Sequence, residues 1–481
     1  ACRGINVQVI ARNSRGDELK DVPLHTMEGS DFFTQDLFDA LAKGEADIAV
    51  HSLKDMSSEH FFGTNRFAVV DREDTRDVAI FNKDIELKIK KEEQIIIGTC
   101  SPRREEMAIG FLQKALPQWS KGFMVVTKNI RGNVDTRLRK LDAGEYDGII
   151  LATAGLNRLL ASEQDAPLIK ELLKTKKLML LPLIECVPAP CQGAIVAEAS
   201  PANEKAVEVL TTINNRRWME TCVKEKKTAM QYGAGCLQKF GVTSIMVGSA
   251  TASPGEVLYA AGKDSEGKTF TKWTGLPDLQ TGKRNLFSTT DFMGSFFEYE
   301  YTRDPVEINE PVVYVANYKA LVQKEWTRQL QTKKVWAAGT KTWIELAKKG
   351  IWVEGCADAF GLEFLLIPWK MPLLTISKSN VAVVTNDHST GNWQAKGWKT
   401  YSTYSLVEKH IPGIGEKINE ADIIFWTSFR QYTQYRNALK KTVIHSCPYG
   451  ETAEQFKTAG IEPVVFPNIK AFQQWRQISI P

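Results

Sequence analysis

The sequence IRGNVDTRLRKLDAGEYDGIILATAGLNRL, at residues 130–159, contains one complete unit of the predicted fold. A helix is predicted at 135–142, and Gly144 follows it at a position where glycine ends helices well. The apolar run at 146–152 has the composition of a buried strand in a parallel sheet. Because a helix and a buried strand alternate here, this stretch predicts an α/β fold.

Strand and helix patterns alternate on both sides of this stretch. Further buried parallel strands are predicted at 47–51, 94–97 and 122–126, with a helix at 33–42. This order predicts right-handed strand–helix–strand units whose strands end in loops at one edge of the sheet. A strand is also predicted at 7–10, so early in the chain that we expect the true first strand of the domain to be missing.

After residue 243 the pattern changes to shorter alternating segments. Turn residues at 253–255 and 265–267 separate these segments, which predicts a small α+β domain with antiparallel strands. The charged, proline-bounded stretch 301–311 predicts a linker to a second α/β region.

The last region contains a faint internal repeat. Residues 311–321 and 422–435 each begin with an apolar strand pattern and continue into a helix pattern. A threonine-led helix and a Gly-Ile turn follow in both copies, at 342–351 and 452–461. Two similar lobes are the simplest interpretation.

Composition limits the possible functions. The 481 residues are 43% hydrophobic and 25% charged, as in globular proteins, and the net charge of +4 is too small for a surface that binds nucleic acid. No run of 18 apolar residues predicts a membrane span. The eight cysteines form no CxxC pair and the six histidines have no metal-ligand spacing, so we expect a reducing, cytoplasmic location and no metal.

Arginines gather where predicted strands end. Arg103 and Arg104 fall in the first turn of a helix that Ser101 caps and Pro102 begins, where the helix dipole opposes a cation. An anion bound between the arginines and the free N–H groups would explain them, and a solvated pair that points away is the alternative. Arg131, Arg137 and Arg158 follow other strands, where α/β sheets bind ligands. Together they predict a ligand with several carboxylates.

Two further segments carry groups suited to catalysis. DIAVHSLKD, at residues 47–55, places Asp55 beside Lys54 after a strand, where a carboxylate can stabilise a cationic intermediate or move protons. An ordinary charged loop is the alternative. Cys236 lies among small residues in GAGC, which leaves room for a covalent group on the thiol. A small buried apolar residue is the other interpretation of this cysteine.

Seven segments, in this order, resemble the hydroxymethylbilane synthase family, also called porphobilinogen deaminase. They are SRGD (14–17), ADIAVHSLKD (46–55), REDTRDV (72–78), GTCSPRR (98–104), the stretch at 130–159, PAPCQGA (188–194) and GAGC (233–236). The resemblance implies two α/β domains like those of periplasmic binding proteins, at 1–73 with 194–214 and at 74–193. It also implies a small α+β domain at 215–300.

The family joins four porphobilinogen molecules head to tail, with loss of ammonia, into a linear tetrapyrrole. By resemblance, Cys236 holds the dipyrromethane cofactor through a thioether, and Asp55 stabilises positive charge on pyrrole nitrogens. The arginines that pair with acetate and propionate side chains correspond to Arg103, Arg104, Arg131, Arg137 and Arg158. Further contacts in the cleft correspond to Ser52, Lys54, Thr99, Ser101 and Gln192. A hinge between the two α/β domains is expected near 74–77 and 187–194.

Some positions depart from the family pattern. Ser30 and Gln35 stand where relatives usually have two lysines, and Lys239 replaces a proline after Cys236. The loss of these lysines favours an alternative, a non-catalytic protein that binds pyrroles or carboxylates on the same scaffold. Retention of Asp55 and Cys236 favours the enzyme.

The region 301–481 resembles uroporphyrinogen-III synthase through DIIFWTSFRQY (422–432) and its threonine-led helices. A fusion of two consecutive enzymes of tetrapyrrole biosynthesis is therefore predicted, with a non-catalytic C-terminal domain as the alternative. Ser428 and Thr452 are candidate ligand contacts in this region, and helix capping is the other interpretation of both.

Overall fold

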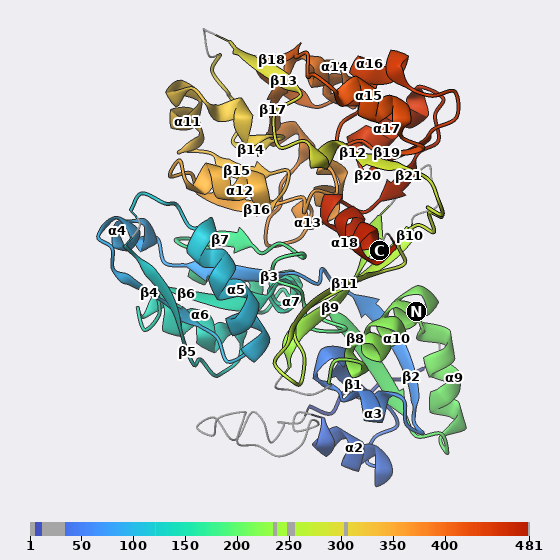
Figure 1. Ribbon diagram of the computed structural model, residues 1–481. Coiled ribbons are helices and arrows are strands. Elements are labelled where there is room, and N and C mark those ends of the chain that lie inside the picture. Colours follow the sequence, from blue (N-terminus) through green and yellow to red (C-terminus); the bar gives the residue numbers. More distant parts are fainter. Residues whose placement is uncertain are drawn as a thin grey trace.

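The computed structural model describes residues 5–11, 34–120, 122–233, 238–247, 255–302 and 306–479. Strands in these ranges form five sheets with helices packed on them, so the predicted α/β class is confirmed. In Figure 1 the blue and green N-terminal half lies below the orange and red C-terminal region.

The first domain is built on a three-stranded sheet in the order β1-β8-β2. Its strands are β1 (Ala49–Ser52), β2 (Arg66–Arg72) and β8 (Ala194–Ala199), and its helices include α2 (Gln35–Ala42), α3 (Ser58–Phe61) and α9 (Glu204–Ile213). Both strand pairs are antiparallel, so the prediction of a parallel strand at 47–51 is wrong in direction. The reason is that β8 lies between β1 and β2 and returns from the second domain in the opposite sense.

The second domain contains a five-stranded sheet in the order β5-β4-β6-β3-β7. The strands are β3 (Asp77–Phe81), β4 (Gln94–Gly98), β5 (Met124–Lys128), β6 (Gly148–Ala152) and β7 (Lys177–Leu180). The helices are α4 (Ile85–Lys90), α5 (Pro102–Ala115), α6 (Val134–Asp142), α7 (Thr153–Ala161) and α8 (Ala166–Leu173). Strand β4 is parallel to β5 and β6, as predicted, whereas β3 is antiparallel to both of its neighbours.

The third domain is small and antiparallel, as the turn pattern predicts. Helix α10 (Arg216–Met230) precedes a meander of β9 (Lys239–Val247), β10 (Gly255–Lys263) and β11 (Thr269–Thr274). The predicted strand at 7–10 is not present: residues 5–11 have no regular secondary structure, and Val7 and Val9 are exposed. No described strand pairs with this run, so its apolar pattern alone does not make a strand.

The C-terminal region consists of two sheets, which are the two lobes that the repeat predicts. The six-stranded sheet contains β13 (Phe297–Tyr301), β14 (Val312–Val315), β15 (Lys334–Ala337), β16 (Val353–Cys356), β17 (Val381–Asn386) and β18 (Lys399–Glu408). The four-stranded sheet contains β12 (Leu286–Ser288), β19 (Ile423–Phe425), β20 (Ile444–Pro448) and β21 (Val464–Phe466). Helices of this region include α11 (Lys324–Leu330), α12 (Thr340–Ala347), α16 (Phe429–Tyr435), α17 (Glu451–Thr458) and α18 (Ile469–Ser479).

The C-terminal sheets begin earlier in the chain than predicted. Strand β12 pairs with β19, and β13 pairs with β18, so residues 286–301 belong to the C-terminal sheets. The predicted boundary at residue 300 is therefore too late. A charged, proline-bounded stretch marks a break in the sequence, but strand pairing decides the sheet to which the preceding residues belong.

One hydrophobic core joins the second domain to the C-terminal region. It includes Phe81, Phe111 and Leu116 of the former with Val335, Trp343 and Leu346 of the latter. Burial of such side chains contributes about 25 cal/mol for each Å² removed from water. The two halves are therefore packed together and not only tethered. Among the described residues, no helix is long and apolar enough to cross a membrane.

Candidate functional site

The end of strand β1 carries the predicted carboxylate of the site. A short 3₁₀ turn, Leu53–Asp55, follows β1, and its buried Leu53 anchors the turn while Lys54 and Asp55 stay half-buried. The pKa of Lys54 lies below its ordinary value. Burial is the main cause, and the nearby Arg104 and Arg103 add to it, while Asp55 and Asp77 oppose it. Groups from the first and second domains therefore meet within electrostatic reach of Lys54.

Helix α5 begins as the sequence predicts. Pro102 is its first residue, and the Ser101 hydroxyl accepts a hydrogen bond from the Arg104 N–H. Thr99 is buried, and its hydroxyl accepts a hydrogen bond from the Ser101 N–H at 3.2 Å. In this structure both hydroxyl groups shape the start of the helix.

Both arginines of α5 are buried and paired with one carboxylate. Arg103 Nη2 and Arg104 Nη2 each lie 2.8 Å from an oxygen of Asp77, the first residue of β3. Burial works to raise the pKa of Asp77, but the two arginines outweigh it and hold the pKa well below its usual range. The alternative of a solvated pair pointing away is thereby excluded for Arg103 and Arg104.

Asp77 also fixes Gln192. The Gln192 side-chain amide donates to Asp77 Oδ1 at 2.9 Å and to the Thr75 carbonyl at 2.6 Å. Sequence reasoning missed Asp77 as a site residue, although it lies in the REDTRDV segment (72–78). This segment could have pointed to Asp77, because it is one of the segments that resemble the family and its acidic residues had been given no role.

Three more predicted arginines lie on the second domain. Arg137, on α6, donates from Nε to the Gly132 carbonyl at 2.7 Å, and Arg158, on α7, donates to the Gly193 carbonyl at 2.6 Å. The pKa of Arg137 is lowered by burial, and the nearby Arg104 and Arg131 lower it further against the opposing effect of Cys100. The structure thus gathers Arg104, Arg131 and Arg137, and it brings in Cys100, which sequence reasoning did not select.

A buried ion pair supports the segment that carries Gln192. Arg72 Nη2 lies 2.8 Å from Glu225 of α10, and Arg72 Nε donates to the Gln192 carbonyl at 3.2 Å. The same carboxylate accepts hydrogen bonds from the Cys191 and Ser244 N–H groups, both at 2.7 Å. All three domains of the N-terminal half therefore meet at this ion pair.

The remaining predicted residues are not seen in this cluster, for different reasons. Cys236 and Ser30 lie outside the described residues, and Gln35 is on α2, where it donates to Asp39. Ser52 is exposed at the end of β1. In the C-terminal region the Ser428 hydroxyl caps α16 in a capping box, whereas Thr452 is half-buried in the first turn of α17.

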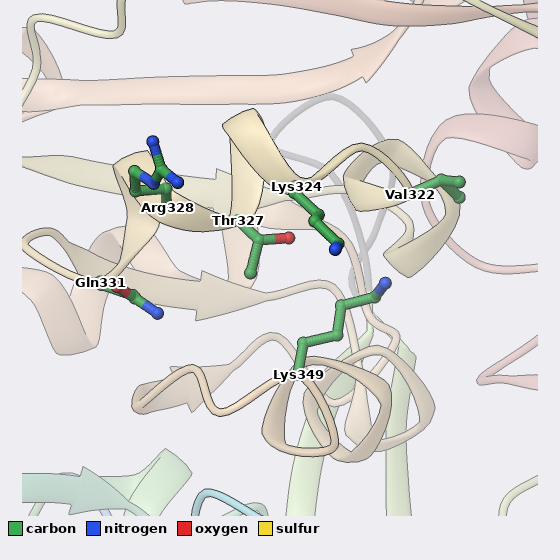
Figure 2. Close-up of a pocket in the computed structure, with 6 residues that line it drawn as sticks. All are labelled: Val322, Lys324, Thr327, Arg328, Gln331 and Lys349. Atoms are coloured by element: carbon green, nitrogen blue, oxygen red, sulfur yellow. The ribbon is translucent and has the colours of Figure 1, made fainter. Parts of the chain in front are cut away.

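A cavity of about 400 Å³ lies on the C-terminal region, beside α11 and the end of α12 (Figure 2). It is lined by Val322, Lys324, Thr327, Arg328, Gln331 and Lys349. None of the predicted site residues lines it. Its lining comes from the C-terminal region alone, whereas the cluster around Asp77 belongs to the N-terminal half, so the two are separate.

Sequence comparison places this chain in a known family. Residues 2–208 match the family model described as porphobilinogen deaminase, dipyromethane cofactor binding domain. A probable porphobilinogen deaminase of Methanocella arvoryzae is 37% identical over 262 residues, which cover 54% of this chain and 78% of the relative. The chain belongs to the porphobilinogen deaminase family. This membership confirms the predicted enzyme class, a transferase.

A second deaminase relative, from Metallosphaera sedula, is 36% identical over 240 residues, or 50% of this chain and 72% of the relative. Solved structures with weaker similarity include a mutant uroporphyrinogen III synthase of Thermus thermophilus, with TM-score 0.24 and 14% identity over 35% of this chain and 77% of that one. A periplasmic arginine-binding protein of Salmonella typhimurium has TM-score 0.21 and 11% identity, over 41% and 77% of the two chains. The family assignment rests on the deaminase relatives.

Proposed function

We propose that the chain condenses four porphobilinogen molecules head to tail, with release of ammonia, on a dipyrromethane held by Cys236. Family membership supports this activity. The observation that carries it is the meeting of Lys54 and Asp55 of the first domain with Arg103, Arg104 and Asp77 of the second. A carboxylate and a group of cations from two domains lie close enough to interact electrostatically.

The charge of this cluster fits a ligand with carboxylates. Burial is the main cause that lowers the pKa values of Lys54 and Arg137, and neighbouring arginines lower them further, so a bound anion would favour the charged form of both groups. Each pyrrole ring brings two carboxylates, which can form charge-assisted pairs with these cations. Lys54, Arg131, Arg137 and Arg158 would hold the dipyrromethane and the growing chain. When bound, the dipyrromethane supplies the pyrrole carbon to which the first substrate is joined.

Asp55 would stabilise the positive charge that develops on the substrate pyrrole as ammonia leaves. The bond from the aminomethyl carbon to nitrogen breaks, a bond from that carbon to a ring carbon forms, and the ring carbon loses its proton. A fixed carboxylate beside the pyrrole N–H lowers the energy of this cationic stage. The turn Leu53–Asp55 fixes Asp55 because Leu53 is fully buried.

The Asp55 role is tested by porphobilinogen consumption. Asp55→Asn keeps the size of the side chain and removes its charge, so we expect turnover to fall by at least a hundredfold. Asp47→Asn is the matched control, because Asp47 is exposed at the start of the same strand segment and bonds only to Asn203 among the contacts described. Equal turnover by Asp55→Asn and wild type would contradict the assignment. Tight pyrrole binding without turnover by the wild type would support the non-catalytic alternative.

We propose a second activity for the C-terminal region, closure of the linear tetrapyrrole to uroporphyrinogen III. The supporting observation is its architecture: two α/β lobes joined by the antiparallel pair β13 and β18. In a synthase of this kind the fold shapes the substrate for ring inversion, loss of water and closure. Ser428 is engaged in capping α16, so of the two candidates Thr452 has the freer hydroxyl for a ligand contact.

A further inference from the structure

Two crossing segments join the first and second domains of the deaminase half. They are residues 73–76, between β2 and β3, and residues 181–193, between β7 and β8. Each segment leads directly to a partner of the site arginines. Arg76 precedes Asp77, which pairs with Arg103 and Arg104, and the Val187 carbonyl accepts a hydrogen bond from Arg103 Nη1 at 2.7 Å.

The C-terminal region contacts both crossing segments. Asp358, just after β16, accepts a hydrogen bond from the Ile184 N–H at 3.3 Å. The guanidinium of Arg76 stacks over the ring of Phe364 at 4.9 Å, and Arg76 and Asp358 are close enough to interact electrostatically. Both side chains are buried, at 3% and 0% exposure, in an interface where such interactions are little screened.

Arg76 and Asp358 carry opposite charges, and each has buried polar atoms without a hydrogen bond in the described chain. Within the described residues, Asp358 Oδ2 has no hydrogen-bond partner, and neither have Nε and Nη2 of Arg76, whose Nη1 pairs with Asp74 at 2.5 Å. The two groups form no direct ion pair in the described chain, and the buried carboxylate and the buried guanidinium attract each other over a longer distance. This attraction acts from the C-terminal region on the residue next to Asp77.

The backbone at Asp358 is strained. Asp358 and the following Ala359 have φ angles of 51° and 62°, a left-handed conformation that is unfavourable for residues other than glycine. Hydrogen bonds from the Ala357 and Ala359 N–H groups to the carbonyls of Ala337 and Ala338 hold the turn in this conformation. The turn thereby presents the Asp358 carboxylate to the deaminase half.

We propose that Asp358 is a positioning residue for the deaminase site and that the C-terminal region acts through it as a brace on both crossing segments. The brace keeps Asp77 and the Val187 carbonyl in register with Arg103 and Arg104. Domain motion during chain growth would then move the first domain against a block formed by the second domain and the C-terminal region. The proposal rests on the proposed deaminase function.

The test uses the full chain with Asp358→Asn, Asp358→Ala and Asp387→Asn. Asp387 is the control, because it is an exposed aspartate of the same region. At pH 8 we expect kcat for porphobilinogen consumption to fall about tenfold in both Asp358 variants, with KM unchanged and the thermal midpoint not lowered in Asp358→Asn. Hydrogen exchange at the Ile184 amide should quicken in Asp358→Ala.

A second variant protects the test against misfolding. Phe364→Leu removes the ring from Arg76 but keeps apolar volume at a half-buried position, and we expect the same loss in kcat. Wild-type kcat in Asp358→Asn and Phe364→Leu would overturn the proposal, as would unchanged exchange at Ile184 in Asp358→Ala. If the wild type itself shows no turnover, the proposed function fails, and exchange at Ile184 still decides whether Asp358 holds the crossing segment.

Discussion

Asp77 holds three residues that the sequence assigns to ligand binding: Arg103, Arg104 and Gln192. Two guanidinium groups share one carboxylate, so one positive charge remains for a substrate carboxylate. The sequence predicts that a bound ligand supplies the anion beside Arg103 and Arg104, whereas in the structure Asp77 of the protein itself supplies one. The cluster is buried, which makes each of its charges costly to leave without a partner.

Replacement of Asp77 tests this arrangement. Asp77→Asn leaves two buried arginines without their carboxylate, so we expect the free energy of unfolding to fall by about 3–5 kcal/mol and turnover to fall with it. The control is Asp291→Asn, because Asp291 forms a solvent-accessible pair with Arg476 that contributes about 1 kcal/mol or less. Denaturant unfolding of both variants measures the difference. Equal losses in the two variants would contradict the burial argument.

The charge of Asp358 gives a pH-dependent prediction. Burial raises the pKa of Asp358 to about 6, against the opposing effect of Arg76 and the Leu183 and Ile184 N–H groups and with a smaller contribution from Glu185. The folded state therefore binds a proton more tightly than the unfolded state, and stability falls as pH rises from about 4 to about 6.

Asp358→Asn removes this effect, so the variant should exceed the wild type by about 3 kcal/mol at pH 8, from a pKa difference of roughly two units. The advantage should vanish near pH 4. Thermal melts at both pH values measure it. A variant less stable than the wild type at pH 8 would show that ionised Asp358 contributes net stability.

At the scale of elements, helix α5 connects the site to the C-terminal region. Its first turn carries Arg103 and Arg104, and its last residue, Ala115, accepts a hydrogen bond from Trp343 Nε1 of α12 at 3.1 Å. The rings of Phe111 and Trp343 meet edge to face at 5.2 Å. A single helix therefore touches the cluster around Asp77 at one end and the C-terminal region at the other.

Trp343→Phe tests this junction. The variant keeps an aromatic ring but leaves the Ala115 carbonyl without its donor, so we expect a loss of about 1–3 kcal/mol in stability. Trp218→Phe, on the half-exposed face of α10, is the control and should cost less. Chemical denaturation followed by far-UV circular dichroism compares them. Equal losses of stability in the two variants would show that the hydrogen bond from Trp343 to Ala115 does not stabilise the junction.

The local sequence predicted individual helices and strands well, but it did not predict which distant residues and strands pair with one another. The helix start at Ser101–Pro102 and the strands at 94–97 and 146–152 follow from capping chemistry and apolar runs, which act within a few residues. The pairing of Asp77 with Arg103, 26 residues apart, and the antiparallel direction of β1 depend on how distant segments meet. No local sequence pattern encodes contacts between distant segments. For the same reason the sequence did not indicate Asp358 as a residue that contacts the deaminase half.

At the scale of the whole molecule, the two halves share a core. Trp352 of the C-terminal region donates to the Leu178 carbonyl at 3.1 Å and packs against Phe81, so the second domain is covered on this side. Two halves with such an interface form a single structural unit. This arrangement places the proposed second activity on the same body as the first.

Product analysis tests the second activity. The linear tetrapyrrole closes without a catalyst to the type I isomer, so the full chain supplied with porphobilinogen should yield the type III isomer if the C-terminal region acts on it. Chromatography of the oxidised porphyrins separates the isomers. Type I product alone would leave the C-terminal region with the bracing role only.

The intact mass of freshly purified protein tests the central claim, covalent assembly on Cys236. We expect the wild type and Cys100→Ser to carry the added mass of one dipyrromethane, and Cys236→Ser to lack it and to show no turnover. Cys100 is the decisive control because its thiol lies among the same arginines. An unmodified wild type, or an adduct that survives Cys236→Ser, would contradict the account.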